Sequence, residues 1–125
     1  MKYLILIIAV LLLPAKLEAT EIKRIVAWYS IESLKTEGTW KTSKGVMANG
    51  EKFLDDNFTA ASNIHALGTW LLVTNTQNGK TVLVKVTDRI SKRFTNKRID
   101  LSKKAFSKIA NLEQGIVLCK IRELE

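Results

Sequence analysis

A hairpin signal in the middle of the chain constrains the fold more than any other feature. Thr81–Thr87 reads T-V-L-V-K-V-T, and its alternating valines give a β-strand one apolar face. Trp70–Thr74 also has strand composition, and Asn78-Gly79 between the two stretches is typical of a turn joining antiparallel strands. The sequence therefore predicts paired strands that bury the valine face.

Asp88 follows directly after the second of these strands. If the strand is unbroken, its period of two places Asp88 on the same side as the valines. A carboxylate at the edge of an apolar interior is partly desolvated, which raises its pKa and suits it to proton transfer. The alternative is a strand-end Asp that hydrogen-bonds a turn or pairs with Arg89.

The rest of the chain also favours short strands. We expect strands at Arg24–Ser30 and Ile116–Arg122, and a long loop over Ile31–Met47 that contains the isolated Trp40. A helix begins after Asp100 or Ser102 and runs to about residue 110, with an apolar stripe formed by Ala105, Phe106, Ile109 and Leu112. Several short strands, one helix and no βαβ alternation predict a small β-barrel with a helical connection.

The N-terminus predicts export. Lys2 precedes an apolar run from Tyr3 to Leu13, Pro14 breaks this run, and Ala19 offers a small residue for cleavage. This pattern is typical of a signal peptide over residues 1–19, and the run is short for a membrane span, although an uncleaved anchor is the alternative. No Cys lies near the cleavage point, so a lipoprotein is not expected. We expect a periplasmic, cell-wall or extracellular protein that meets the membrane only through this peptide.

Composition excludes several kinds of site. Cys119 is the only cysteine, so the exported chain has no internal disulfide, and its apolar neighbours favour a buried structural thiol. One histidine and no cysteine cluster predict no metal site, and no nucleotide motif is present, so we expect no cofactor. The net charge of +8 and the basic run over residues 92–98 suit an anionic wall polymer or a solvated surface. Export and few interleaved aromatic residues argue against nucleic acid.

Eight short motifs occur in an order that resembles the RlpA-like double-psi β-barrel family. They are W-Y-S (28–30), A-N-G-E (48–51), T-A-A-S (59–62), L-G-T (67–69), V-T-N (73–75), N-G-K (78–80), V-T-D-R (86–89) and R-I-D-L-S (98–102). The similarity extends from about Ile25 to Ile121. It implies an all-β fold over residues 20–125: a six-stranded double-psi β-barrel with one short helix and a groove across its mouth. We separately expect a monomer.

The resemblance also implies an envelope function. Several members are lytic transglycosylases, which cut peptidoglycan glycan strands without water and leave a 1,6-anhydromuramyl end. The family's catalytic acid corresponds to Asp88, and Glu51 would orient Asp88, stabilise oxocarbenium-like charge or bind sugar hydroxyls. One carboxyl can give and then recover the proton, because no water needs activating on the opposite face. Asp100 corresponds to a residue with a structural role, and the expected substrate-binding residues are Trp40, Asn49, Ser62, His65 and Arg89.

The chain departs from the family pattern beside the expected acid. Ser62 stands where the family has a groove histidine, and the only histidine, His65, lies three residues later. Asp88-Arg89-Ile90-Ser91-Lys92 replaces the usual D-R-G-P-F, and the loop before A-N-G-E is longer than usual. A non-catalytic wall-binding or wall-loosening module of expansin type is the alternative function. In either case Trp40 and Trp70 could stack on sugar rings, unless Trp70 belongs to the core.

Overall fold

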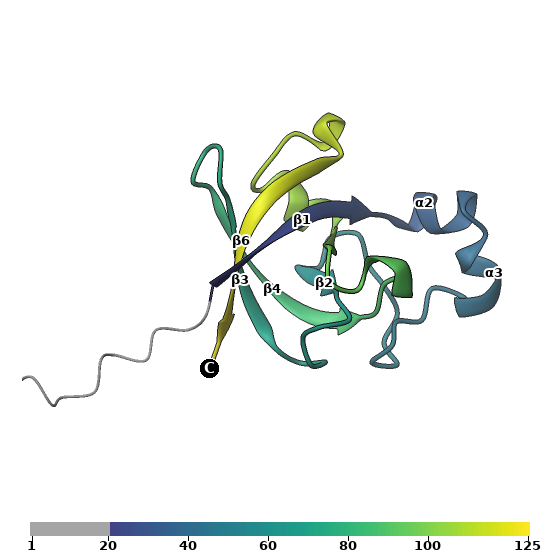
Figure 1. Ribbon diagram of the computed structural model, residues 1–125. Coiled ribbons are helices and arrows are strands. Elements are labelled where there is room, and N and C mark those ends of the chain that lie inside the picture. The colour runs from purple at the N-terminus through teal and green to yellow at the C-terminus, as the bar shows by residue number, and fades with distance from the viewer. Residues whose placement is uncertain (1–20) are drawn as a thin grey trace, which may run out of the picture.

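The structure is a computed structural model that describes residues 21–125, so the expected signal peptide lies outside the described residues. Its six strands are β1 (Glu21–Tyr29), β2 (Thr59–Ala61), β3 (Trp70–Asn75), β4 (Thr81–Asp88), β5 (Arg98–Ser102) and β6 (Ile116–Leu124). They close into a barrel in the order β1-β5-β2-β4-β3-β6 (Figure 1). The pairs β1–β5 and β2–β4 are parallel, and the other neighbours are antiparallel. The prediction of a six-stranded all-β barrel is confirmed.

The predicted hairpin joins β3 and β4. Leu71 pairs with Val84 and Val73 with Val82, and all four side chains are buried. Gly79 has φ +73°, a left-handed conformation that glycine adopts without strain. The turn chemistry and the apolar alternation therefore specify the same register.

The alternation in β4 breaks just before Asp88. Val86 pairs with Ala60 and Asp88 pairs with Ala61, so one extra residue, Thr87, is accommodated in β4. Thr87 is buried like Val86, whereas Asp88 is partly exposed. The strand continues to Asp88, but this bulge-like irregularity in its pairing with β2 interrupts the strict alternation, so Asp88 is partly exposed at the strand's end.

A single apolar core fills the barrel. Val26, Leu101 and Phe106 are among its side chains with no exposed surface. Cys119 is also fully buried, and burial raises the pKa of its thiol to about 12, as expected for a structural cysteine.

The helix α4 (Lys103–Ser107) covers one end of this core. Ser102 caps it by accepting a hydrogen bond from the Ala105 N–H, and Ala105, Phe106 and Ile109 point into the core as predicted. The helix is shorter than predicted, and Asp100 lies within β5 rather than at the helix start. Beyond it, the 3₁₀ turn η2 (Leu112–Gln114) leads into β6.

The prediction of one long loop over residues 31–47, and of only one helix, is wrong. This segment forms α2 (Ile31–Thr36) and α3 (Thr39–Ser43), and the turn η1 (Lys92–Phe94) adds a second 3₁₀ helix to the described chain. Ser30 begins α2 because its side chain accepts the Ser33 N–H while the Ser33 hydroxyl accepts the Ser30 N–H. Gly38, at φ +82°, separates the two helices.

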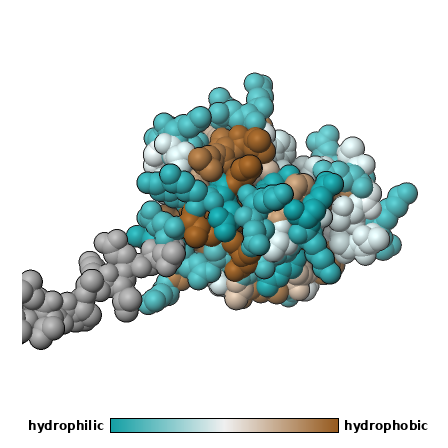
Figure 2. Space-filling view, viewed as in Figure 1, coloured by the Kyte–Doolittle hydropathy of each residue, from teal (hydrophilic) through white to brown (hydrophobic). Residues whose placement is uncertain are grey.

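The additional helices lie at one end of the molecule. Figure 1 places α2 and α3 beyond the end of β1, away from the C-terminus. Among residues 21–125 no helix has the length and apolar character needed to span a membrane. An apolar patch lies on the outer face of the barrel over β1 and β6 (Figure 2), where Ile25, Ile116 and Leu118 are exposed.

Candidate active site

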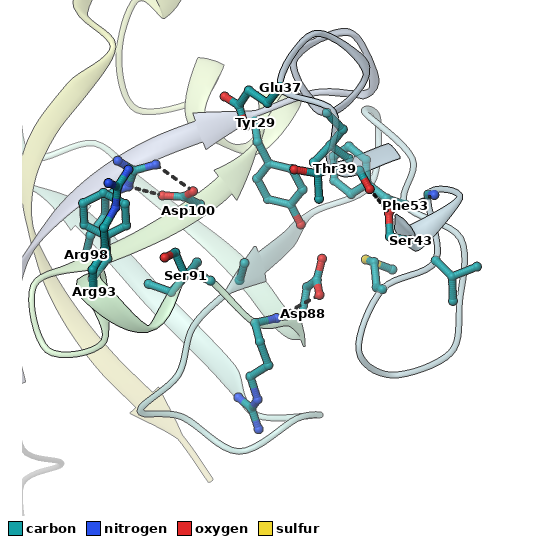
Figure 3. A pocket seen from close by; sticks show the side chains of 18 residues that line it. Tyr29, Glu37, Thr39, Ser43, Phe53, Asp88, Ser91, Arg93, Arg98 and Asp100 are labelled. Atoms are coloured by element: carbon teal, nitrogen blue, oxygen red, sulfur yellow. Dashed lines mark hydrogen bonds and ion pairs between the residues drawn. The ribbon is translucent and has the colours of Figure 1, made fainter. Parts of the chain in front are cut away.

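A pocket of about 430 Å³ lies at the end of the barrel where β1 and β4 finish (Figure 3). Its floor is a second apolar cluster formed by Tyr29, Met47, Phe53 and Ala61, separate from the barrel core. Three carboxylates line it, from Glu37, Asp88 and Asp100. The pocket therefore combines an apolar floor with a small number of charged groups, which is the usual make-up of a ligand site.

Asp88 is held by one of its two oxygens. Its Oδ1 accepts hydrogen bonds from the Ala48 N–H at 3.0 Å and from the Arg89 N–H at 2.8 Å. Its Oδ2 has no hydrogen-bond partner in the described part of the chain. Burial raises the pKa of Asp88 above its ordinary value, and the two N–H donors and the Arg89 charge offset part of that rise. The result is a fixed carboxyl with one free oxygen and a tendency to hold a proton.

The donor Ala48 belongs to a tight turn that docks on the end of β4. The Asn49 N–H donates to the Thr87 carbonyl at 3.1 Å, and the Thr87 hydroxyl contacts the Met47 sulfur at 3.2 Å. Within the turn, the Asn49 side-chain oxygen accepts the Glu51 N–H at 3.0 Å. The A-N-G-E motif thus binds the Asp88 carboxylate through a backbone group, the Ala48 N–H.

Arg89 connects the acid to the loop that follows β2. Its guanidinium donates to the Ser62 carbonyl at 2.7 Å and to the His65 carbonyl at 2.5 Å. The Ser62 N–H in turn donates to the Asp88 carbonyl at 3.0 Å. Arg89 lines the pocket, but these two bonds commit its guanidinium to the protein backbone.

Asp100 is paired with a cation. Arg98 donates to its two oxygens at 2.6 and 3.0 Å, and this pairing raises the pKa of Arg98. Two guanidiniums contact the Phe94 ring, with Arg98 at 4.4 Å and Arg93 at 4.7 Å from its centroid. Figure 3 shows this group on the opposite side of the pocket from Phe53 and Ser43. Of Asp88 and Asp100, only Asp88 therefore keeps a carboxylate oxygen without a partner among the described residues.

The expected site residues separate into two groups. Asp88, Arg89 and Asp100 line the pocket, whereas Trp40, Asn49, Glu51, Ser62 and His65 do not. Glu51 is exposed on the turn described above. Ser62 is fully buried, and its hydroxyl accepts the Ile64 N–H at 3.2 Å.

His65 and the two tryptophans lie elsewhere. His65 is buried and its Nδ1 lies 2.5 Å from a carboxylate oxygen of Glu123 on β6, so it is not the surface histidine that its loop position suggests. Trp40 packs on Gly45, with the Lys35 ammonium 4.9 Å from its ring centroid. Trp70 is 44% exposed on β3, which excludes the core alternative.

Two kinds of lining residue were not predicted from the sequence. Tyr29 and Phe53 stack at the pocket floor with ring centroids 4.4 Å apart, and the conjunction of W-Y-S with an apolar residue after A-N-G-E is the only signal that could have suggested them. Glu37 reaches the pocket from the end of α2, a helix that the sequence reasoning did not expect. In the described residues no three His, Cys, Asp or Glu side chains form a group that could hold a metal ion.

Comparison with known proteins identifies relatives of the whole barrel. The model of a double-psi β-barrel family described as lytic transglycolase matches residues 26–121. The endolytic peptidoglycan transglycosylase RlpA of Neisseria meningitidis is 38% identical over 77 residues, which are 62% of this chain and 32% of that protein. An uncharacterised protein of Synechocystis is 42% identical over 78 residues, 62% of this chain and 81% of its own length. The chain thus spans about a third of the Neisseria relative.

Solved structures show the same fold at lower identity. A Streptomyces papain inhibitor has a TM-score of 0.65 at 21% identity, covering 85% of this chain and 96% of its own. An expansin of Clavibacter michiganensis, solved as a D78N mutant with cellohexaose, has a TM-score of 0.61 at 20% identity, covering 85% of this chain and 51% of its own. The closed barrel, the order of its strands and the match over residues 26–121 lead to one conclusion: this chain belongs to the RlpA-like double-psi β-barrel family.

Proposed function

We propose that this protein is an exported lytic transglycosylase that cleaves peptidoglycan glycan strands, with Asp88 as its acid. The observation that carries the proposal is the state of Asp88. One carboxyl oxygen is fixed by two backbone donors, the other is free, and burial raises the pKa. Its RlpA relatives are named endolytic peptidoglycan transglycosylases, which supports the same reaction.

The proposed reaction uses Asp88 twice. Protonated Oδ2 gives its proton to the glycosidic oxygen as the bond to the muramic acid C1 breaks and oxocarbenium-like charge develops there. The carboxylate then takes the proton from the sugar's own 6-hydroxyl, whose oxygen bonds to C1 and closes the 1,6-anhydro ring. No second carboxylate is needed, because no water is activated on the opposite face of the ring.

The surroundings of Asp88 suit this cycle. Burial favours the protonated acid before cleavage, and the two N–H donors stabilise the carboxylate that forms afterwards. Asp100 is neutralised by Arg98, so its proposed role is structural: it holds the basic side of the pocket. Glu51 and Asn49 belong to the turn that binds the end of β4, and we expect any contact of theirs to be with sugar hydroxyls beyond the cleaved bond.

The basic side of the pocket suggests how the wall is approached. Lys92, Arg93 and Lys97 are exposed around the Phe94 ring. We expect this surface to attract anionic wall polymers, with an attraction that weakens as salt is added. We also expect the protein to act as a monomer in the periplasm or cell wall, without a cofactor and without nucleic acid.

The test compares wild type with Asp88→Asn, a substitution that keeps the Oδ1 acceptor. Both proteins are incubated with intact sacculi and with peptide-stripped glycan strands, and soluble products are identified by mass spectrometry. We expect anhydromuramyl ends from wild type and none from the variant, while Asp56→Asn, which changes an exposed carboxylate outside the pocket, retains the activity of wild type.

Other products would overturn the proposal in distinct ways. Reducing ends from wild type would identify a hydrolase. No product from either substrate, together with co-sedimentation on sacculi, would leave the expansin-like wall-binding module. The specific observation favouring that alternative is that Glu51 and Ser62 do not line the pocket.

A further inference from the structure

The Tyr29 hydroxyl is a buried polar group without a partner. The residue is 9% exposed, and its hydroxyl oxygen has no hydrogen-bond partner among the described residues. A buried hydroxyl without a partner destabilises the fold, so its presence in a native protein calls for an explanation. The ring itself is well held, because it stacks on Phe53 with an interplanar angle of 25°.

Asp88 is the group that this hydroxyl faces. Figure 3 shows the Tyr29 hydroxyl directed at the Asp88 carboxylate across the floor of the pocket. Since Oδ1 of Asp88 is occupied by the Ala48 and Arg89 N–H groups, Oδ2 is the oxygen available to a new donor. The Asp88 charge also acts on the phenol, since it contributes to the raised pKa of Tyr29.

The phenol is a donor that does not lose its proton. Burial raises the pKa of Tyr29, and the negative charges of Asp88 and Asp100 raise it further. Tyr29 therefore stays neutral whenever Asp88 is charged. A neutral donor beside a carboxyl stabilises its charged form more than its protonated form.

We propose that Tyr29 is a positioning residue for Asp88, whose hydroxyl donates a hydrogen bond to Oδ2 once that carboxyl has given up its proton. The proposed role in the reaction rests on the proposed function, but the hydrogen bond itself does not. During cleavage the phenol stabilises the carboxylate left after the glycosidic oxygen is protonated, and it keeps its own proton throughout. The phenol also orients Oδ2 so that this oxygen can accept the proton of the sugar's 6-hydroxyl.

The test is Tyr29→Phe, which keeps the ring and its stack on Phe53 and removes only the hydroxyl. The titration of the Asp88 carboxyl carbon is followed by NMR without substrate. Loss of a donor to the carboxylate should move its midpoint upward by about one pH unit. In the cleavage assay the pH profile should move by the same amount, and kcat should fall about tenfold, because the weakened acid ionises less readily.

Thr59→Val is the matched control. Thr59 also has a buried hydroxyl that no group among residues 21–125 hydrogen-bonds, and it does not line the pocket. We expect the Asp88 midpoint in this variant to equal that of wild type. An unchanged midpoint in Tyr29→Phe, a downward shift, or the same shift in both variants would overturn the proposal.

A second measurement covers the case in which Tyr29→Phe does not fold. In the wild-type protein the ring carbon that bears the Tyr29 hydroxyl should report the titration of Asp88, and Asp88→Asn should remove that response. If the chemical shift of this carbon does not change with pH in wild type, the proposed hydrogen bond does not form. Because both titrations are made without substrate, absence of cleavage would count against the proposed function alone.

Discussion

Replacing Asp88 by Asn should abolish activity and at the same time stabilise the fold at neutral pH. The Asn oxygen can accept the same N–H groups of Ala48 and Arg89, so the local geometry is retained. What is lost is the acid, and with it about a hundredfold or more in rate. The free energy of unfolding should rise, because the variant has no partly buried charge at this position.

The sign of the stability effect follows from the direction of the pKa shift. The pKa of Asp88 is raised on folding, so its stabilising contribution is fully present below the unfolded value of about 3.8 and is lost as pH rises through the folded value. Wild type and Asp88→Asn should therefore be similar near pH 3, where both side chains are neutral. At pH 7 the variant should be more stable.

Two features of Asp88 limit the expected gain in the free energy of unfolding: its contact with solvent and the N–H donors that already stabilise its charge. Asp88 is partly exposed and already accepts two hydrogen bonds, so a gain of about 0.5–1 kcal/mol at pH 7 is expected after allowing for solvent screening. For a domain of this size that corresponds to a rise in Tm of roughly 2–6 °C.

Urea unfolding at pH 3 and pH 7 measures the effect, with Asp56→Asn as the control for removing an exposed carboxylate. We expect no pH-dependent gain from the control. If Asp88→Asn is less stable than wild type at pH 7, or gains as much at pH 3, burial of the Asp88 charge does not destabilise the protein and the reasoning above is refuted.

Three further predictions concern the scaffold. Phe106→Ala, in the fully buried core, should lower the free energy of unfolding by about 3–5 kcal/mol; a loss under 1 kcal/mol by urea titration would show that the core is not packed around this ring. Cys119, whose thiol pKa is raised to about 12, should react with a thiol reagent at pH 8 only after unfolding, and rapid labelling of the native protein would contradict its burial. Asn63→Ala should increase amide hydrogen exchange at Ile90 at least tenfold while Asn96→Ala does not, because the Asn63 side chain accepts the Ile90 N–H and donates to the Ile90 carbonyl; equal exchange rates in the two variants would show that these bonds do not hold the Ile90 backbone.

Local sequence patterns predicted β1, β3, β4 and β6, because each pattern depends on neighbours along the chain, whereas the six-stranded closure that includes β2 and β5 was predicted from the family resemblance. The hairpin of β3 and β4 follows from alternating valines and Asn78-Gly79, and the start of α4 follows from Ser102 as an N-cap. The helix α2 was missed because Ser33, rather than Glu or Gln, completes the capping box begun by Ser30, and α3 was missed because its N-cap, Gly38, makes no side-chain capping bond. A short helix with this weak signal is difficult to distinguish from a loop.

The candidate site was predicted less completely, because its parts are not local. Asp88 follows from its position at a strand end, but its partner Ala48 contributes a backbone N–H, which no side-chain pattern can reveal. The same motif suggested Glu51, whose side chain is exposed outside the pocket. Tyr29 and Phe53, distant in sequence, meet only through the barrel topology.

The departures from the family pattern beside Asp88 are compensated by backbone contacts. Asn63 accepts the Ile90 N–H at 3.0 Å and donates to the Ile90 carbonyl at 2.9 Å, so it fixes the segment in which the family has Gly-Pro. Ser62 binds the end of β4 through its own N–H and carbonyl, which Asp88 and Arg89 engage, and these contacts do not depend on its side chain. The scaffold can therefore hold Asp88 in place without the family's histidine. For that reason, activity in this chain should depend on the carboxyl of Asp88 and on the groups that control its proton.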